Sequence, residues 1–218
     1  MTRKRLFTGD TLDAVAYIVL LLAVASWIAI LCVKQLTYGL EFDESYLLGV
    51  ANNLASGSGY VDDGVTFLST SEPFSPVIST GPTVLIPVSL TWWIFDGNLL
   101  AIRFTMLIFF GILLFSVWRL FGNLSGRWAS LAAVGGLALV PTVAPDLQNT
   151  SLMPGRVVGE LPALALLLLA GLLLSKHRYF WSGLCLGLML LSKLTFAIPA
   201  AALIATFFVF ELLNRHIG

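Results

Sequence analysis

The sequence predicts an all-α polytopic membrane protein with about six transmembrane helices, and three observations support this fold class. Hydrophobic residues make up 58% of the 218 residues, whereas charged residues make up only 11%. The mean hydropathy is +0.92, which leaves too few polar side chains to cover a soluble protein of this length. Long apolar segments recur along the chain, and the charges separate by sign once those segments are placed.

Six of seven apolar segments are expected to cross the bilayer. The seven are residues 13–34, 82–95, 99–121, 128–143, 160–174, 179–192 and 195–213. The first is expected to be a retained span, because no small-x-small cleavage site follows it. Segment 82–95 is the exception, since at ~1.5 Å per residue it reaches only about 21 Å of a core of about 30 Å. Its Trp92 and Trp93 favour the interface, so we expect an interfacial or re-entrant helix.

The charge distribution favours six crossings with a cytoplasmic N-terminus. In this arrangement eight of the twelve cations lie on the inner side and nine of the twelve acids on the outer side. Counting 82–95 as a crossing would move Arg119 and Arg127 to the outside, against the positive-inside rule. No basic stripe indicates nucleic-acid binding.

A long outer loop, about residues 35–98, connects the first two crossings and carries most of the polar side chains. From Asp43 to about Ser56 its apolar residues recur at helical spacing, which predicts an amphipathic helix on the membrane surface. Glycines then break this pattern, and the stretch up to Pro82 is expected to be extended. No linker divides the chain, so residues 1–218 are expected to form a single membrane domain.

Asp43 and Glu44 are the first candidate site, directly after the first span. Adjacent carboxylates at this position suit a general base or a cation site. Asp43 also suits the N-cap of the surface helix, and Glu44 suits its first turn. The two interpretations are compatible, and local chemistry does not choose between them.

Three cations and one further acid are candidate binding residues on the outer side. Arg156 and Glu160 are four residues apart, which allows a helical ion pair, and the Arg156 guanidinium suits a phosphate. Glu160 leads into an apolar run, where an acid is costly. Lys193 and Arg103 each either extend to lipid phosphate or bind an anionic ligand. No Walker loop, zinc-ligand spacing or Ser/His/Asp set is present, so no metal site is predicted.

Four stretches share an outer placement and a characteristic order. They are DESYLLGVANNLASGSGY at 43–60, IFDGNLLAIRF at 94–104, GRVVGELP at 155–162 and GLCLGLMLLSKLTF at 183–196. Together they resemble the GT-C superfamily of membrane glycosyltransferases that use polyprenyl-phosphate sugars, in particular the protein O-mannosyltransferase and aminoarabinose transferase group. The resemblance covers nearly the whole chain.

The resemblance implies an inverting, lipid-phosphate-sugar-dependent hexosyltransferase. Asp43 matches the catalytic base of that superfamily, and Glu44 matches a second acid that supports the base or positions the acceptor. Arg156, Lys193 and Arg103 are the expected contacts to the donor phosphate. Glu160 matches an acidic residue at the start of a span in related enzymes. No cofactor is firmly implied, and dependence on a divalent metal stays open.

The resemblance also implies partners and a location. We expect a polyprenyl-phosphate-linked sugar donor, contact with membrane lipid, and an integral plasma (inner) membrane protein whose active face is periplasmic or extracellular. Members of the superfamily are usually much longer, so the chain matches their N-terminal module. A missing C-terminal half or a partner subunit would complete it, and whether the chain is a fragment stays open. The alternative function is a non-catalytic membrane subunit that binds lipid-linked sugar or assembles with a partner.

Overall fold

The computed structural model describes residues 9–62, 72–75, 80–143 and 153–217. Within these residues the chain is almost entirely helical. The helices are α1 (Gly9–Thr37), α2 (Phe42–Ala55), α3 (Pro82–Ile94), α4 (Leu99–Ser125), α5 (Arg127–Val143), α6 (Glu160–Leu174), α7 (Tyr179–Leu190), the 3-10 helix η2 (Leu194–Phe196) and α8 (Ala197–Ile217). Strands β1 (Val61–Asp62) and β2 (Glu72–Pro73) pair antiparallel. This short ladder, in the loop predicted to lie on the outer side, is a small departure from the predicted all-α fold.

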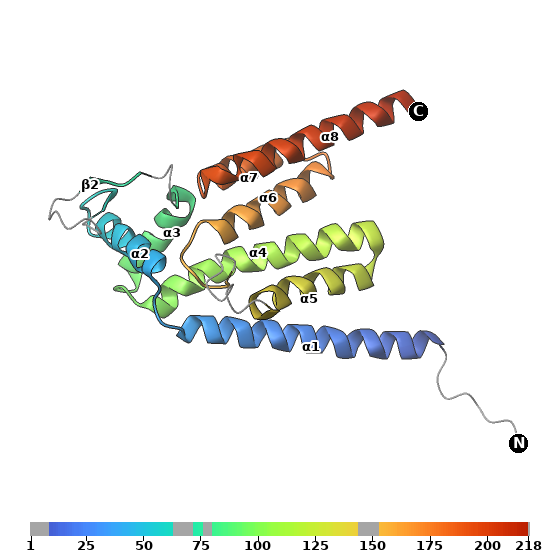
Figure 1. Cartoon of the computed structure of the whole chain (residues 1–218), viewed down its shortest axis with the longest axis horizontal. Helices are drawn as coiled ribbons and strands as arrows, with labels where there is room; N and C mark the ends of the chain where they lie inside the picture. Colours follow the sequence, from blue (N-terminus) through green and yellow to red (C-terminus); the bar gives the residue numbers. More distant parts are fainter. Residues whose placement is uncertain (1–8, 63–71, 76–79, 144–152, 218) are drawn as a thin grey trace, which may run out of the picture.

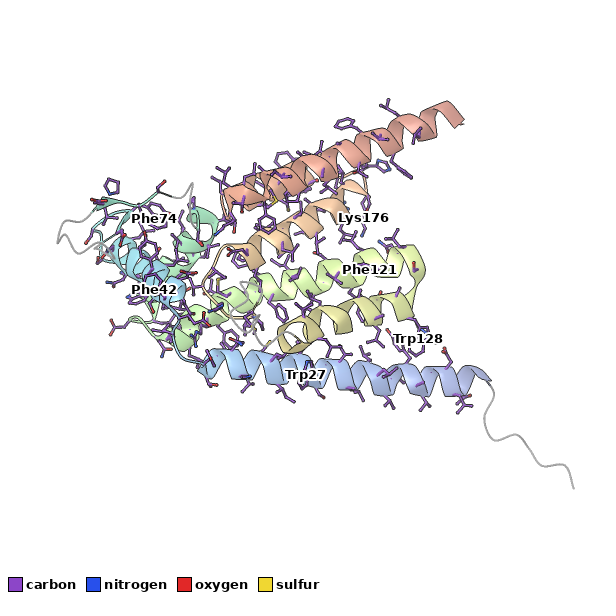
Figure 2. All side chains as sticks on the ribbon, viewed as in Figure 1. Trp27, Phe42, Phe74, Phe121, Trp128 and Lys176 are labelled. Atoms are coloured by element: carbon purple, nitrogen blue, oxygen red, sulfur yellow. The ribbon has the colours of Figure 1, made fainter. Side chains whose placement is uncertain are left out.

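Six helices, α1 and α4 to α8, run along a common direction and pack on one another, and α2 and α3 gather at one end of this bundle (Figure 1). The beginning of α1 and the end of α8 both lie at the opposite end. Figure 2 places Lys176 and Trp128 toward that opposite end, whereas Phe42 and Phe74 lie at the α2 end. The bundle thus has two different ends, and the long predicted loop forms one of them.

Among the residues that the structure describes, three segments are long and apolar enough to cross a membrane: Thr11–Thr37 in α1, Leu99–Ser125 in α4, and Leu194–Leu213, which contains most of α8. The helices α5, α6 and α7 are apolar but shorter. The fold class, a helical integral membrane protein, is therefore confirmed. Six crossings and their orientation stay predictions, since a 15-residue helix such as α6 spans only about 22 Å and would need a thinned bilayer or flanking residues.

The outer surfaces of α1 and α8 are apolar. Leu22 and Val33 of α1 are 61% and 62% exposed, and Ile198 of α8 is 81% exposed. Side chains of this kind project from both helices along their lengths (Figure 2). In water this exposure would oppose folding, whereas in lipid it costs nothing. Apolar residues can therefore occupy all sides of α1 and α8, and their helical periodicity is weak.

The helix α2 packs on α3 and on the beginning of α4 through one buried cluster that includes Leu47, Val50, Leu85 and Ile102. The apolar face of α2, predicted to lie on the membrane, is therefore covered largely by protein. Part of this cover comes from α3, which lies beside α2 at the end of the bundle (Figure 1). The 13 residues of α3 reach only about 20 Å. Pro82 suits the first turn of α3 because its missing N–H would have no helical partner there.

Candidate functional site

An ion pair between Arg103 of α4 and Glu44 of α2 joins two helices near the α2 end of the bundle. Arg103 donates from Nε to Oε1 of Glu44 at 3.0 Å and from Nη2 to Oε2 at 2.7 Å, in the bidentate geometry of a guanidinium and a carboxylate. The two side chains are only 3% and 1% exposed. Glu44 therefore faces the protein interior.

The same guanidinium closes the connection between α1 and α2. Arg103 also donates to the backbone carbonyls of Gln35 at 3.1 Å, Leu36 at 3.3 Å, Tyr38 at 2.6 Å and Gly39 at 3.3 Å. Gln35 and Leu36 belong to the last turn of α1, where carbonyls lack the usual helical partner four residues on, and Tyr38 and Gly39 follow the helix. All three nitrogens of Arg103 are thus occupied by protein, and they fix where the chain leaves α1 and enters α2.

A pocket of about 580 Å³ lies where that connection meets the segment before α6. Its lining residues are Tyr38, Gly39, Leu40, Glu41, Phe42, Asp43, Arg156 and Val158. It brings together two of the residues that the sequence singled out, Asp43 and Arg156, which are far apart in the chain. Because its lining includes the beginning of α2, the pocket lies at the end of the bundle where Figure 1 shows α2.

Asp43 is exposed in the first turn of α2 and does not cap it. The N-cap is Glu41, with extended backbone and no hydrogen bond from its side chain to the helix, so the predicted capping role of Asp43 is wrong by two residues. Among the described residues, no side chain hydrogen-bonds to or ion-pairs with the Asp43 carboxylate. The negative charge still suits the positive end of the helix dipole. Asp43 is therefore a carboxylate held on a rigid element and directed to the pocket wall.

Arg156 forms an ion pair with Glu41 at the pocket wall, where the Arg156 side chain is 9% exposed and that of Glu41 is 24% exposed. Burial lowers the pKa of Arg156 from its usual value, and the nearby Tyr38 and Glu160 oppose that lowering. A buried guanidinium needs a counter-charge, because desolvation otherwise disfavours its charged form. Glu41 supplies it here.

Glu160 and Lys193 form a second ion pair beside Arg156. Lys193 Nζ lies 2.9 Å from Glu160 Oε1, and both side chains are partly buried. The predicted helical pair of Arg156 with Glu160 does not form as an ion pair, because α6 begins only at Glu160 and its N-cap is Gly159. Arg156 precedes the helix, so four residues of separation do not place the two side chains on one face. Glu160 acts on Arg156 through its charge instead.

Backbone contacts hold the segments that carry Lys193 and Glu160 close together. Gly81 donates its N–H to the carbonyl of Ser192 at 2.9 Å, and Ser192 Oγ donates to the carbonyl of Gly159 at 2.9 Å. A Cβ on Gly81 would lie 2.1 Å from the Leu191 oxygen, and one on Gly159 would lie 2.6 Å from the Ser192 oxygen. Only glycine fits at these two positions, so the beginnings of α3 and α6 and the turn before η2 meet in one place.

The structure therefore sorts the predicted site residues into two groups. Asp43 and Arg156 line the pocket, and the charges of Glu160 and Lys193 adjoin it. Glu44 and Arg103 do not line the pocket and are buried in an ion pair with each other. Glu41 was not among the predicted site residues, although it stands in the same acidic run of the sequence. The missing signal was its partner, since no local pattern connects Glu41 to Arg156.

No cluster of three or more His, Cys, Asp or Glu side chains that could hold a metal ion occurs in the part of the chain that the structure describes. The described side chains therefore offer no such set of ligands for a divalent metal.

Residues 79–218 match the family described as dolichyl-phosphate-mannose-protein mannosyltransferase. No curated protein and no solved structure matches the chain. The matched region includes α3 to α8 and four of the predicted site residues, Arg103, Arg156, Glu160 and Lys193, and it excludes α1 and α2.

Proposed function

Because the chain belongs to the dolichyl-phosphate-mannose-protein mannosyltransferase family of membrane glycosyltransferases, we propose that it transfers a sugar from a polyprenyl-phosphate donor to an acceptor hydroxyl at the pocket between α2 and the segment before α6. The observation that carries this proposal is that Asp43 and Arg156 line the same pocket. A carboxylate suits removal of a proton from the acceptor. A guanidinium suits the phosphate that leaves.

In the proposed reaction Asp43 is the general base. The acceptor oxygen attacks the anomeric carbon, its proton passes to the Asp43 carboxylate, and the bond between that carbon and the phosphate oxygen breaks. The bonding electron pair leaves on the phosphate, so the polyprenyl phosphate gains negative charge beside Arg156, which stabilises it. A single displacement of this kind inverts the configuration at the anomeric carbon.

Glu44 and Arg103 take a positioning role in this proposal. Arg103 is saturated by Glu44 and the carbonyls after α1, so it acts through the backbone that carries Asp43 and does not contact the donor. Lys193, held near the pocket by Glu160, is a second cation for the lipid phosphate. The pocket lies at the predicted periplasmic or extracellular end, where a lipid headgroup would reach it.

The decisive experiment is Asp43→Asn, assayed for sugar transfer from a labelled polyprenyl-phosphate sugar by the purified chain in lipid nanodiscs. General-base catalysis contributes about 100- to 10,000-fold to rate, so we expect transfer to fall at least about 100-fold. The thermal unfolding midpoint is expected to stay unchanged, because the carboxylate is exposed and has no described partner.

Asp96→Asn is the matched control. Asp96 is an exposed acid at the α3–α4 connection with a φ of 49°, a conformation that Asn tolerates. This variant is expected to retain transfer. Undiminished transfer by Asp43→Asn would remove Asp43 as the base. A wild-type chain that binds polyprenyl phosphate but transfers no sugar would instead support the non-catalytic binding subunit.

A further inference from the structure

We propose that the Glu41 carboxylate occupies the position on Arg156 that the donor phosphate takes, so that Glu41 acts as a built-in competitor that must leave before the donor binds. The inference rests on the proposed function, and it adds a residue that controls donor affinity. It begins from the Arg156–Glu41 ion pair at the pocket wall. A guanidinium fork pairs equally well with a carboxylate and with a phosphate.

The charges that line the pocket require such a change. Its charged lining residues among those described are the two acids Glu41 and Asp43 and the single cation Arg156. A phosphodiester donor brings a further negative charge, and the leaving phosphate brings more. Like charges close together oppose ionic binding. If Glu41 stayed on Arg156, the donor would meet a pocket wall with a net negative charge.

Glu41 is placed so that it can leave. Its side chain is 24% exposed, so the carboxylate reaches water by rotating away from Arg156. Its side chain makes no capping hydrogen bond to α2, although Glu41 is the N-cap residue. Glu44 is the opposite case, since it is 1% exposed and held by two hydrogen bonds from Arg103. Of the two acids, only Glu41 can exchange its cation for solvent.

Arg156 in turn needs one partner at all times. Its burial lowers its pKa, and an unpaired buried guanidinium is costly. Glu41 therefore keeps Arg156 charged and oriented before the donor binds. The donor phosphate takes over this function when it binds.

The test is the affinity of the purified full chain in nanodiscs for a short-chain polyprenyl monophosphate, compared between the wild type and two variants. Glu41→Gln removes the charge and keeps the size. Glu41→Ser removes the carboxylate and supplies a side chain that is preferred at the N-cap, so α2 stays folded. Both variants are expected to bind the probe at least about tenfold more tightly. In transfer assays both are expected to lower the donor KM.

Two controls separate this effect from general charge. Asp96→Asn removes one negative charge from an exposed position at the same end of the bundle and is expected to leave the affinity within about twofold, because surface charges are screened. In an Arg156→Met background, Glu41→Gln is expected to change the affinity no further, because the competition acts through Arg156.

Unchanged or weaker binding by both Glu41 variants would overturn the inference, because Glu41 would then only hold Arg156 in place. Equal tightening by Asp96→Asn would overturn it too. Either result, obtained with a wild-type chain that transfers sugar, leaves the proposed function standing. A wild-type chain that neither binds the probe nor transfers sugar would overturn the proposed function, and this inference with it.

Discussion

Glu41 and Glu44 lie one helical turn apart at the beginning of α2, and each pairs with an arginine from a later segment of the chain, yet the two pairs have different surroundings. The Arg103–Glu44 pair is almost completely buried, and Arg103 also binds four backbone carbonyls. The Arg156–Glu41 pair lines a pocket, and Glu41 keeps a quarter of its side-chain surface exposed.

Both pairs join a glutamate to an arginine, so residue type does not distinguish them. Burial and the number of further hydrogen-bond acceptors around the arginine decide whether the pair can exchange a partner for a ligand. A pair that is fully enclosed and saturated cannot accept a ligand without breaking the fold. A pair that faces a pocket can exchange one partner for a ligand of the same charge. In the proposed mechanism, Arg103 therefore holds the backbone that carries Asp43, and Arg156 is the residue that we expect to contact the donor phosphate.

The largest expected effect is on folding stability at the buried pair. Arg103→Met leaves the Glu44 carboxylate buried without a counter-charge, which typically costs about 3–5 kcal/mol. We expect the free energy of unfolding in detergent to fall by that amount, with sugar transfer lost as well. The matched substitution at the pocket, Arg156→Met, is expected to cost only about 1 kcal/mol, because Glu41 can turn to water.

The double variant Arg103→Met/Glu44→Leu tests the reason for that loss. Replacing both partners of a buried pair by apolar residues is often neutral, so the double variant is expected to recover much of the stability. Full recovery is not expected, since the carbonyls after α1 lose their donor. Equal destabilisation by Arg103→Met and Arg156→Met would contradict the distinction between the two pairs.

The second effect is on donor affinity at the pocket pair. A hydrogen bond to a charged group contributes about 1.5–3 kcal/mol, so Arg156→Met is expected to weaken binding of a polyprenyl phosphate by about ten- to a hundredfold. Arg156→Lys keeps the charge but loses the fork geometry, and it is expected to recover only part of that affinity. Binding isotherms in nanodiscs measure both. Affinity that is unaffected by Arg156→Met would place the phosphate elsewhere, with Lys193 as the next candidate.

The smallest effect concerns a third polar contact of α2, which joins it to the β1–β2 ladder. Burial, together with a hydrogen bond to Asp62 and the negative charge of Asp62, raises the pKa of Tyr46 to about 12. A raised pKa means that folding favours the neutral phenol. The stabilisation is thus complete below the usual pKa of 10.0 and is lost as the pH rises toward about 12.

We therefore expect the thermal unfolding midpoint of the wild type to fall between about pH 10 and 12, and to fall less in Tyr46→Phe. Tyr60, whose pKa burial also raises to about 12, contributes in the same window, so Tyr46→Phe/Tyr60→Phe is expected to show the weakest dependence. Identical pH profiles for all three proteins would show that folding does not raise the pKa of these phenols above that of the unfolded chain.

Much of the fold follows from the sequence, because hydropathy is a local property. The apolar segments 99–121, 128–143 and 160–174 correspond closely to α4, α5 and α6. The interruption near Lys193 correctly separated α7 from α8. The surface helix was predicted to within one residue at each end, but its buried face was assigned to lipid, since a sequence does not indicate which of two apolar environments covers an apolar side chain.

The sequence by itself determined that this protein is helical and belongs in a membrane, and that acidic residues gather in the loop between the first two spans. Only the tertiary structure decided which acid meets which cation. Helical spacing allowed an ion pair of Arg156 with Glu160, whereas in the structure Arg156 pairs with Glu41 and Glu160 pairs with Lys193. The physical reason is that an ion pair depends on distances of a few ångströms between segments far apart in the chain. Those distances are set by close-packed junctions, such as Gly81 and Gly159 against the turn at Ser192, which no local pattern encodes.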